Sequence, residues 1–388
     1  MNEKTLKLKS GWKMWRFDQM ATNINVRVDN PSESGMEHYV GLEHLDADSL
    51  KIRRWGTPDD VEATKLMFKK GDIIFGRRRA YQRKLGVADF DGICSAHAIV
   101  LRAKSDVVLP EFLPFFMQSD VFMNRAVEIS VGSLSPTINW KTLAVQEFLL
   151  PPIDEQKRII SVIESAIECE MAYEQARNAA SALFRAASVE LLDPADTWKQ
   201  IQLQDVATVE RGKFSHRPRN LPKFFGGPYP FVQTGDIVAS TGDLRGASQM
   251  LSDEGLKYSK SFPKDSILIT IAANIGFTAI TTQETWCPDS VVGIVPKDGT
   301  NVHFLEYMLR AKQKYLENHV ATQTAQKNIN LQDLKPLRLD MPDAAIQKKI
   351  ADQLHRLEKA VADLDNRLVT ARNFRVQLAN EKIGVVDV

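Results

Sequence analysis

Two long stretches of the chain place apolar residues at alternating spacings of three and four. One stretch lies in the middle of the chain and the other near its C-terminal end. This spacing predicts two long helices, each with an apolar stripe of the kind that packs in a coiled coil. Each stretch follows proline, at Pro151-Pro152 and at Pro342, and proline suits a helix start. The residues that we expect at the packing seam are Ile159, Ala166, Tyr173, Ala180, Ile350, Leu357, Leu364 and Ala371, and Val162, Cys169 and Leu183 belong to the same stripe.

A single stripe of this kind could simply pack on its own globular domain. Two equivalent helices, the first of them rich in alanine, instead favour close packing of the helices against each other. A short polar turn at 192–196, which contains Pro194, ends the first helix. A helix of about 38 residues would span roughly 57 Å, so antiparallel packing would put the globular parts of the chain at opposite ends.

The sequence before each predicted helix has the pattern of a mixed α and β domain. Short β-branched runs alternate with Gly, Pro, Asn and Asp, as in Gly71 to Phe75 and Ser266 to Ala272, and helical segments follow around 112–125 and 302–319. We therefore predict an α+β protein in which each of two globular α/β domains is followed by a long helix. The expected parts are a first domain at 1–152, a central helix at 153–193, a second domain at 197–342 and a C-terminal helix at 343–388.

The chain also repeats itself. The segment NWKTLAVQEFLLPPIDEQKRI, from Asn139, returns about 190 positions later as NLQDLKPLRLDMPDAAIQKKI, from Asn330. Four more blocks recur in the same order. They are FDQMAT at Phe17 with LQDVAT at Leu203, FKKGDIIF at Phe68 with FPKDSILI at Phe262, Cys94 with Cys287, and FLPFFM at Phe112 with FLEYML at Phe304. Five ordered matches predict a tandem repeat of one architecture.

Composition narrows the setting without identifying a function. At 388 residues, two or three hydrophobic cores are expected, and 44% apolar with 26% charged residues is typical of a folded protein. No apolar run is long enough to span a membrane, so we expect no membrane partner and a cytoplasmic location. Three scattered cysteines, Cys94, Cys169 and Cys287, predict reduced thiols and no structural metal. A net charge of +1 means that any nucleic-acid surface must be a local patch.

The strongest basic patch is GRRRAYQRK, which follows the predicted strand GDIIF. Its residues could bind DNA phosphates or a guanine edge, and its tyrosine could pack on a sugar or base. A basic run is often only a solvated face, and that alternative stays open here. The candidate DNA-binding residues are Arg77, Arg78, Arg79, Tyr81, Arg83 and Lys84.

Two further regions carry DNA-binding candidates. The second repeat has the loop RGKFSHRPRN, which does not align with the first cluster, so the two halves could use different loops. A polar segment ahead of each repeated Asn offers hydroxyl and amide groups, although it could equally be a plain cap for the following helix. The candidates are Arg211, Lys213, His216, Arg217 and Arg219 in the loop, and Ser133, Ser135, Thr137, Gln326, Lys327 and Asn328 in the polar segments.

This layout resembles the specificity subunit of Type I restriction-modification systems. The resemblance rests on LPPIDEQKRII (150–160) and MPDAAIQKKIA (341–351), each of which starts a helix, and on YVGLEHL (39–45) and KKGDIIFG (69–76). It covers nearly the whole chain. The second repeat departs from it, with Asp343-Ala344-Ala345 where the first has Pro152-Ile153-Asp154, and with PFVQTGDI (230–237) in place of YVGLEHL.

The resemblance implies a role as well as a fold. The two domains would be target-recognition domains that each read one half of a split site in double-stranded DNA. The helices would act as spacers that dock two methyltransferase subunits, and two motor-nuclease subunits could join for restriction. The chain itself would need no cofactor, whereas the methyltransferase would use S-adenosylmethionine and the motor-nuclease ATP and magnesium.

Catalysis by this chain is not expected. It has no GxxxxGK[ST] phosphate loop, no HExxH and no Asn-Pro-Pro-aromatic motif of an adenine methyltransferase, so we assign no catalytic and no metal-binding residue. Two alternatives remain open at this point. One is a coiled-coil adaptor that does not bind DNA, against which the basic aromatic loops argue, and the other is an unrecognised nuclease site.

Overall fold

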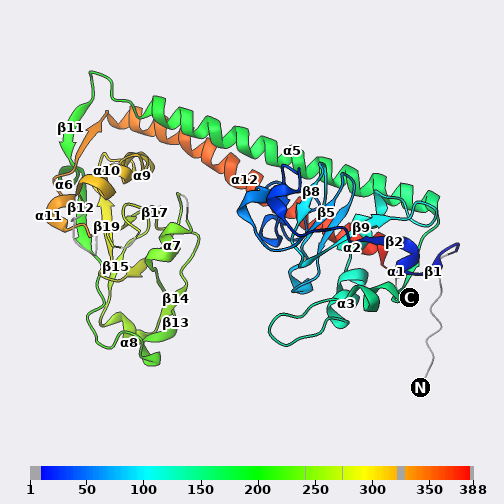
Figure 1. The fold of residues 1–388 in the computed structure, drawn as a ribbon. Coiled ribbons are helices and arrows are strands. Elements are labelled where there is room, and N and C mark those ends of the chain that lie inside the picture. The colour runs from blue at the N-terminus through cyan, green and yellow to red at the C-terminus, as the bar shows by residue number, and fades with distance from the viewer. Residues whose placement is uncertain (1–9, 241, 273, 321–327, 385–388) are drawn as a thin grey trace. The chain divides into compact units, whose positions relative to one another are not determined.

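The computed structural model describes residues 10–240, 242–272, 274–320 and 328–384. They form two compact units. One unit combines 1–174 with 366–388, and the other is 175–365. Each unit therefore contains one globular domain and a part of both long helices, α5 (Ile153–Leu191) and α12 (Ala344–Ile383) (Figure 1).

Domain 1 is built from three small sheets. A two-stranded sheet joins β1 (Lys13–Arg16) to β10 (Glu147–Leu150) and so brings the two ends of the domain together. The first four-stranded sheet has the order β2 (Ala21–Ile24), β9 (Ala98–Ala103), β6 (Ile73–Gly76), β7 (Leu85–Val87). The second has the order β3 (Arg27–Val28), β5 (Lys65–Phe68), β8 (Gly92–Cys94), β4 (Tyr39–Val40).

Short helices cover the first sheet of domain 1. Their bounds are α1 (Phe17–Met20), α2 (Phe112–Gln118), α3 (Asp120–Glu128) and α4 (Trp140–Ala144). The core beneath them is rich in phenylalanine, and the rings of Phe17, Phe116 and Phe148 each contact that of Phe122. Ser119 separates α2 from α3, because its extended backbone ends the first helix and begins the second.

Domain 2 repeats this plan. A two-stranded sheet joins β11 (Lys199–Gln202) to β20 (Arg338–Met341). The first four-stranded sheet has the order β12 (Ala207–Arg211), β19 (Val291–Pro296), β16 (Ile267–Thr270), β17 (Thr278–Ile280). The second has the order β14 (Gln249–Leu251), β13 (Phe225–Phe231), β18 (Thr285–Cys287), β15 (Lys260–Phe262). The helices are α6 (Leu203–Val206), α7 (Thr234–Val238), α8 (Asp253–Leu256), α9 (Val302–Ala311), α10 (Gln313–Tyr315) and α11 (Leu331–Leu334).

The strand orders confirm the repeat that the sequence predicted. Strands β2-β9-β6-β7 correspond one for one to β12-β19-β16-β17. In the second sheets, β4 runs parallel to β8, and β13 runs parallel to β18 in the same way. On the other side, β5 pairs antiparallel with β8, and β15 pairs antiparallel with β18. The fourth strand differs, because β3 lies beside β5 in domain 1 whereas β14 lies beside β13 in domain 2. Each domain therefore has one edge strand that the other lacks.

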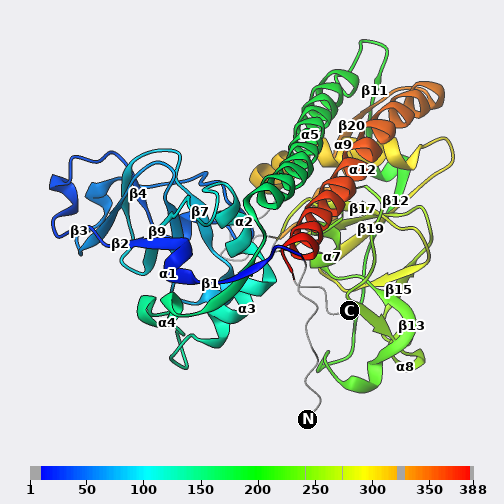
Figure 2. The same ribbon diagram turned by 90° about the vertical axis from the view of Figure 1, so that its right-hand side faces the viewer.

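The two long helices pack together, as predicted, and run antiparallel (Figures 1 and 2). In the first unit, Glu170 of α5 bonds to Arg372 and Arg375 of α12, and in the second unit Arg177 bonds to Asp365. Residue numbers rise along one helix as they fall along the other. Among the described residues, no helix is both long enough and apolar enough to cross a membrane.

The buried face of α5 is rotated from part of the predicted stripe. Val162 and Leu183 are 42% and 56% exposed, and Cys169 is exposed too. Ile163 is fully buried in the domain 1 core, and Phe184 packs against the domain 2 core. Because α5 must contact the globular domains as well as α12, its buried surface shifts toward the domain side.

A buried glutamine fastens the start of each long helix. Gln156 donates from Nε2 to the carbonyls of Pro151 (3.0 Å) and Val107 (3.2 Å), and its Oε1 accepts from the Leu109 amide (2.9 Å). In the second repeat, Gln347 donates to the Pro342 carbonyl (2.9 Å) and accepts from the Asn301 amide (2.9 Å). The recurring spacing of Pro and Gln in the sequence thus has a direct structural cause.

Candidate nucleic-acid interface

The structure brings two of the predicted DNA-binding segments of domain 1 into contact. The Arg79 amide donates to the Pro136 carbonyl (2.7 Å), and Arg78 and Thr137 form a β-bridge. The hydroxyl of Ser135 accepts from Arg78 Nη2 and from Arg79 Nε, both at 3.3 Å. One surface therefore combines arginines with hydroxyl groups, which is the mixture that binds phosphates. We call the residues Arg77, Arg78, Arg79, Ser135 and Thr137 the arginine loop surface.

The arginines of this surface are not paired with any described carboxylate. Within the described part of the chain, no carboxylate pairs with Arg77, Arg78 or Arg79, and the side chains of Arg78 and Arg79 are exposed. The positive charge of Arg78 and Arg77 acts on the neighbouring His97, whose pKa is lowered first by burial and then by these two arginines. Guanidinium groups whose charge no carboxylate neutralises can still bind phosphate oxygens.

Arg83 and Lys84 have other roles within the protein. Arg83 bonds to the carboxylates of Asp48 (2.6 Å) and Asp120 (2.9 Å) and to the Gln118 carbonyl. Lys84 donates to the Leu42 carbonyl at 2.7 Å. Both side chains hold distant loops of domain 1 together, so they have less capacity for DNA than the three arginines before them.

Exposed apolar side chains flank the arginine loop surface. Tyr81 is 55% exposed, and Leu134, which lies next to Ser133 and Ser135, is 91% exposed. Sequence reasoning identified Tyr81 and Ser133 but passed over Leu134, because a lone leucine in a polar loop gives no pattern.

The basic loop of domain 2 is largely braced from within. Arg219 bonds to both oxygens of Asp289 (2.8 and 2.7 Å), Arg217 lies 3.7 Å from the same carboxylate, and Arg211 donates to the Asp289 backbone carbonyl. The His216 ring packs on Phe224 and Tyr258, at centroid distances of 4.6 and 5.0 Å. Lys213 is exposed. A single carboxylate thus shapes the loop and neutralises part of its charge.

The two domains do not present their charge at equivalent positions. In domain 1 the Ile138 amide donates to the Arg77 carbonyl, and in domain 2 the Ile329 amide donates to the Ile271 carbonyl. Asn328 bridges Ala272 as Thr137 bridges Arg78. The apolar residues Ile271 and Ala272 therefore stand in domain 2 where domain 1 has Arg77 and Arg78. Gln326 and Lys327 lie outside the described residues.

A pocket of about 400 Å³ lies beside the basic loop of domain 2. Arg219 and Asn220 line it from the basic loop, and Gln233 and Gln249 line it from the start of α7 and from β14. Its apolar lining is formed by Phe214, Phe225, Phe231 and Pro288. Sequence reasoning missed this site, because its residues are separated by up to about 70 positions and only the fold gathers them.

The long helices form a groove within the first unit. It has a volume of about 690 Å³ and is mainly apolar. Ala166 and Tyr173 of α5 and Ala371 of α12 line it, together with the exposed residues Cys169 and Phe374. Of the other expected seam residues, Ile159 and Ile350 are buried in the domain cores, whereas Ala180, Leu357 and Leu364 are half-buried along the helices.

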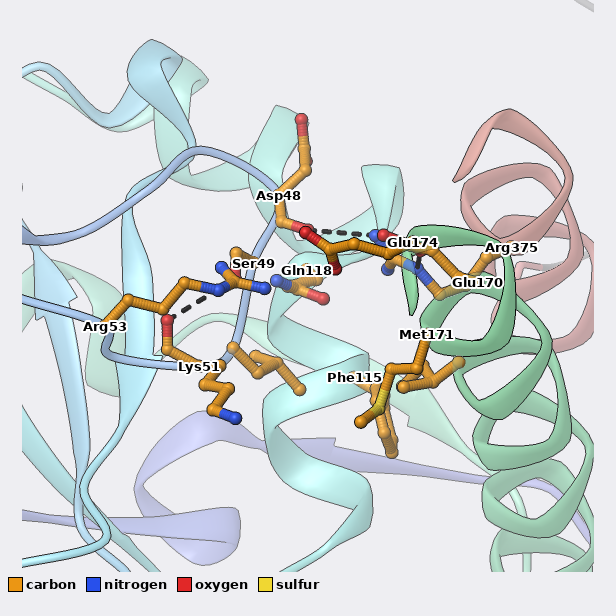
Figure 3. A pocket seen from close by; sticks show the side chains of 12 residues that line it. Asp48, Ser49, Lys51, Arg53, Phe115, Gln118, Glu170, Met171, Glu174 and Arg375 are labelled. Carbon is orange, nitrogen blue, oxygen red and sulfur yellow. Dashed lines mark hydrogen bonds and ion pairs between the residues drawn. The ribbon is translucent and has the colours of Figure 1, made fainter. Parts of the chain in front are cut away.

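Figure 3 shows a smaller cavity, of about 210 Å³, where domain 1 meets both helices. Arg375 of α12 donates to Glu170 of α5 (3.0 Å) and to the Asp48 carbonyl (3.2 Å). Nearby, Asn380 of α12 accepts from the Asp120 amide and donates to the Asp120 carboxylate, both at 2.8 Å. These bonds make a polar joint that fixes domain 1 to the helices.

Domain 2 has a joint of its own to α12. Glu306, fully buried on α9, pairs with Arg310 (2.7 Å) and accepts from the Thr278 hydroxyl (2.6 Å). Arg310 also pairs with Glu358 of α12, which accepts from the Tyr307 hydroxyl at 3.0 Å. Burial, followed by the Glu358 charge, raises the pKa of Tyr307. The tyrosine therefore stays protonated and donates to the carboxylate.

Comparison with known proteins identifies this arrangement. A sequence model of the family described as "Type I restriction modification DNA specificity domain" matches residues 52–180 and 195–369, one match over each repeat. The chain belongs to this family. It is therefore a DNA specificity subunit of a Type I restriction-modification system, which is the non-catalytic component of such an enzyme.

Curated relatives of this specificity subunit include two Type I restriction enzyme specificity subunits. The EcoDI subunit of Escherichia coli is 28% identical over 165 residues, which is 42% of this chain and 36% of that protein. The HindI subunit of Haemophilus influenzae is 20% identical, and the match covers 88% of this chain and 93% of that protein. The chain thus spans about a third of the first relative's length and nearly all of the second's.

Solved structures from Type I restriction-modification systems share the fold. One, described as "Structural basis underlying complex assembly and conformational transition of the type I R-M system", aligns with a TM-score of 0.66 at 20% identity, covering 98% of this chain and 100% of that chain. The HsdS subunit from Thermoanaerobacter tengcongensis aligns with a TM-score of 0.52 at 21% identity, covering both chains fully. At these identities the likeness establishes the fold alone.

Proposed function

We propose that this specificity subunit reads a two-part site in double-stranded DNA, one half with each domain, and directs an adenine methyltransferase to it. The observation that carries the proposal is the repeat of one domain topology, matched twice by the family of DNA specificity domains. The differing positions of the basic groups in the two domains support different half-sites.

The arginine loop surface is the proposed DNA contact of domain 1. Arg77, Arg78 and Arg79 would bind phosphates or guanine edges, with Ser135 and Thr137 adding hydroxyl contacts and Tyr81 packing on a sugar or base. Arg83 and Lys84 would act indirectly, by holding the loop in place. In domain 2, Lys213 would bind phosphate directly. The other candidates, Arg211, His216, Arg217 and Arg219, would shape the loop and contribute the positive charge that the Asp289 carboxylate does not neutralise.

The apolar groove between α5 and α12 is the proposed docking surface for a methyltransferase subunit. Its support is that Phe374, Val162 and Cys169, all exposed, line one mainly apolar groove formed by the two helices. A second methyltransferase subunit, and two motor-nuclease subunits in a restricting complex, would complete the assembly. The methyltransferase would bind S-adenosylmethionine, and the motor-nuclease ATP and magnesium. We place this assembly in the cytoplasm, where its DNA target would be accessible.

The decisive experiment combines co-purification with sequencing of methylated DNA. The chain should form a stable complex with its methyltransferase, and the complex should methylate adenines in a two-part motif with a fixed gap. The triple variant R77E/R78E/R79E should lose discrimination in the first half-site and keep it in the second. A stable complex that never methylates DNA would favour a pure adaptor, and the absence of any complex would refute the proposal.

A further inference from the structure

A pair of glutamine side chains in domain 2 is arranged as a base-reading site. Gln233 Nε2 donates to Gln249 Oε1 at 3.2 Å. Within the described part of the chain, neither side-chain amide has another hydrogen-bond partner. An amide that donates to a second amide leaves its own carbonyl oxygen and the NH2 group of the second amide without a partner in the pair. Here these are Oε1 of Gln233 and Nε2 of Gln249, and both glutamines line the domain 2 pocket.

The pair is held in place before any ligand arrives. The Asp236 carboxylate accepts from the backbone amide of Gln233 (2.8 Å). It also accepts from the backbone amide and the hydroxyl of Ser248 (3.1 and 3.0 Å). Gln249, which follows Ser248, pairs with Phe231 in the sheet. One carboxylate thus fixes the backbone on both sides of the pair, and a preorganised pair loses little entropy on binding.

An acceptor beside a donor matches only one base edge of the major groove well. Adenine presents N6–H2, a donor, next to N7, an acceptor, whereas guanine presents two acceptors. Gln233 Oε1 would accept from N6, and Gln249 Nε2 would donate to N7. The partly exposed ring of Phe225, in the same lining, suits the methyl group of the paired thymine.

Among the described residues, the pair is a feature of domain 2 alone. Gln249 lies on β14, the edge strand that domain 1 lacks. Gln233 lies two residues after Phe231, which pairs with β18, and the equivalent position in domain 1, two residues after Tyr39, is Gly41. We propose that Gln233 and Gln249 together read an adenine in the second half-site and so help to set its sequence. This inference rests on the proposed function and deepens it.

The first test uses the complex of this chain with its methyltransferase. The second half-site of the wild-type motif should contain an A·T pair besides the one that carries the methylated adenine. Q233A and Q249A should each lose about tenfold discrimination at that one pair, with the first half-site unchanged. Q283A, which removes an exposed glutamine of the same domain outside the pocket, is the matched control and should keep the full motif.

A second test isolates the atom that Gln249 would contact. Replacing the adenine by 7-deazaadenine removes N7 and should weaken binding by the wild-type complex about tenfold. The same replacement should change binding by the Q249A complex less than about twofold, because the contact is already lost. Equal effects on both complexes, or a second half-site without a further A·T pair, would overturn the inference. A wild-type complex that methylates no two-part motif would instead refute the proposed function on which it rests.

Discussion

Replacing Gln156 by alanine should loosen the start of α5 and destabilise the first unit. The side chain is fully buried and makes three hydrogen bonds, to Leu109, Pro151 and Val107. Each contributes about 1 kcal/mol net, so Q156A should lower the free energy of unfolding by about 3 kcal/mol. At about 2 to 4 °C per kcal/mol, the Tm of that unit should fall by roughly 6 to 12 °C.

Hydrogen exchange locates the effect. The Leu109 amide donates to Gln156, so it should exchange much faster in Q156A, while the Asn301 amide should stay protected. Q347A should give the opposite result, because Gln347 holds Asn301 in the second unit.

A matched control separates burial from the mere loss of a glutamine. Gln146 is only half-buried, and its side chain donates one solvent-exposed hydrogen bond, to the Thr142 carbonyl (2.9 Å), so Q146A should cost less than about 0.5 kcal/mol. If Q156A were as mild as Q146A, or if Leu109 kept its protection, the assignment of the glutamine as a fastener of the helix start would be wrong.

Three further predictions follow from the charged and thiol groups. The triple variant R77E/R78E/R79E should weaken DNA binding and reduce the dependence of binding on salt concentration. K13E, at an exposed lysine of β1, should change neither. Equal salt dependence in the triple variant and the wild type would exclude the arginine loop surface as a DNA contact. R310M should destabilise the second unit by about 3 to 5 kcal/mol, since it leaves the buried Glu306 carboxyl without its cation, and calorimetry showing a change below about 1 kcal/mol would contradict this. N-ethylmaleimide at pH 8 should label Cys169 and spare Cys94 and Cys287, because burial raises the pKa of both buried thiols and keeps them protonated. The labelled chain should bind the methyltransferase less tightly than labelled C169S, and equal binding would argue against the groove as a docking surface.

Much of the fold could be predicted because its signals are local. The heptad stripes and the prolines before them gave two long helices, and the structure has them as α5 and α12. The recurring blocks coincide with equivalent elements, since FDQMAT and LQDVAT each form a short helix followed by a strand. The rotation of the α5 seam could not be predicted, because it depends on how each domain packs against the helix.

The candidate site was predictable in composition but not in geometry. Arg77 and Arg83 look alike in the sequence, yet Arg83 is paired with Asp48 and Asp120, which lie 35 and 37 positions away. In the same way, Asp289 lies 70 positions from Arg219 and determines how much of its charge remains. A basic run shows where cations are, and only the fold shows which of them already have partners.

The differences between the domains lie where specificity would require them. The elements that attach each domain to the helices are common to both repeats, including β1-β10 with β11-β20 and Gln156 with Gln347. The edge strands and the placement of basic residues differ. A change at an edge strand alters the surface without disturbing the core or the helix attachment, because edge residues have neighbours on one side only. One scaffold can therefore carry two different half-site readers, and Gln249 on β14 is the clearest place to test that separation.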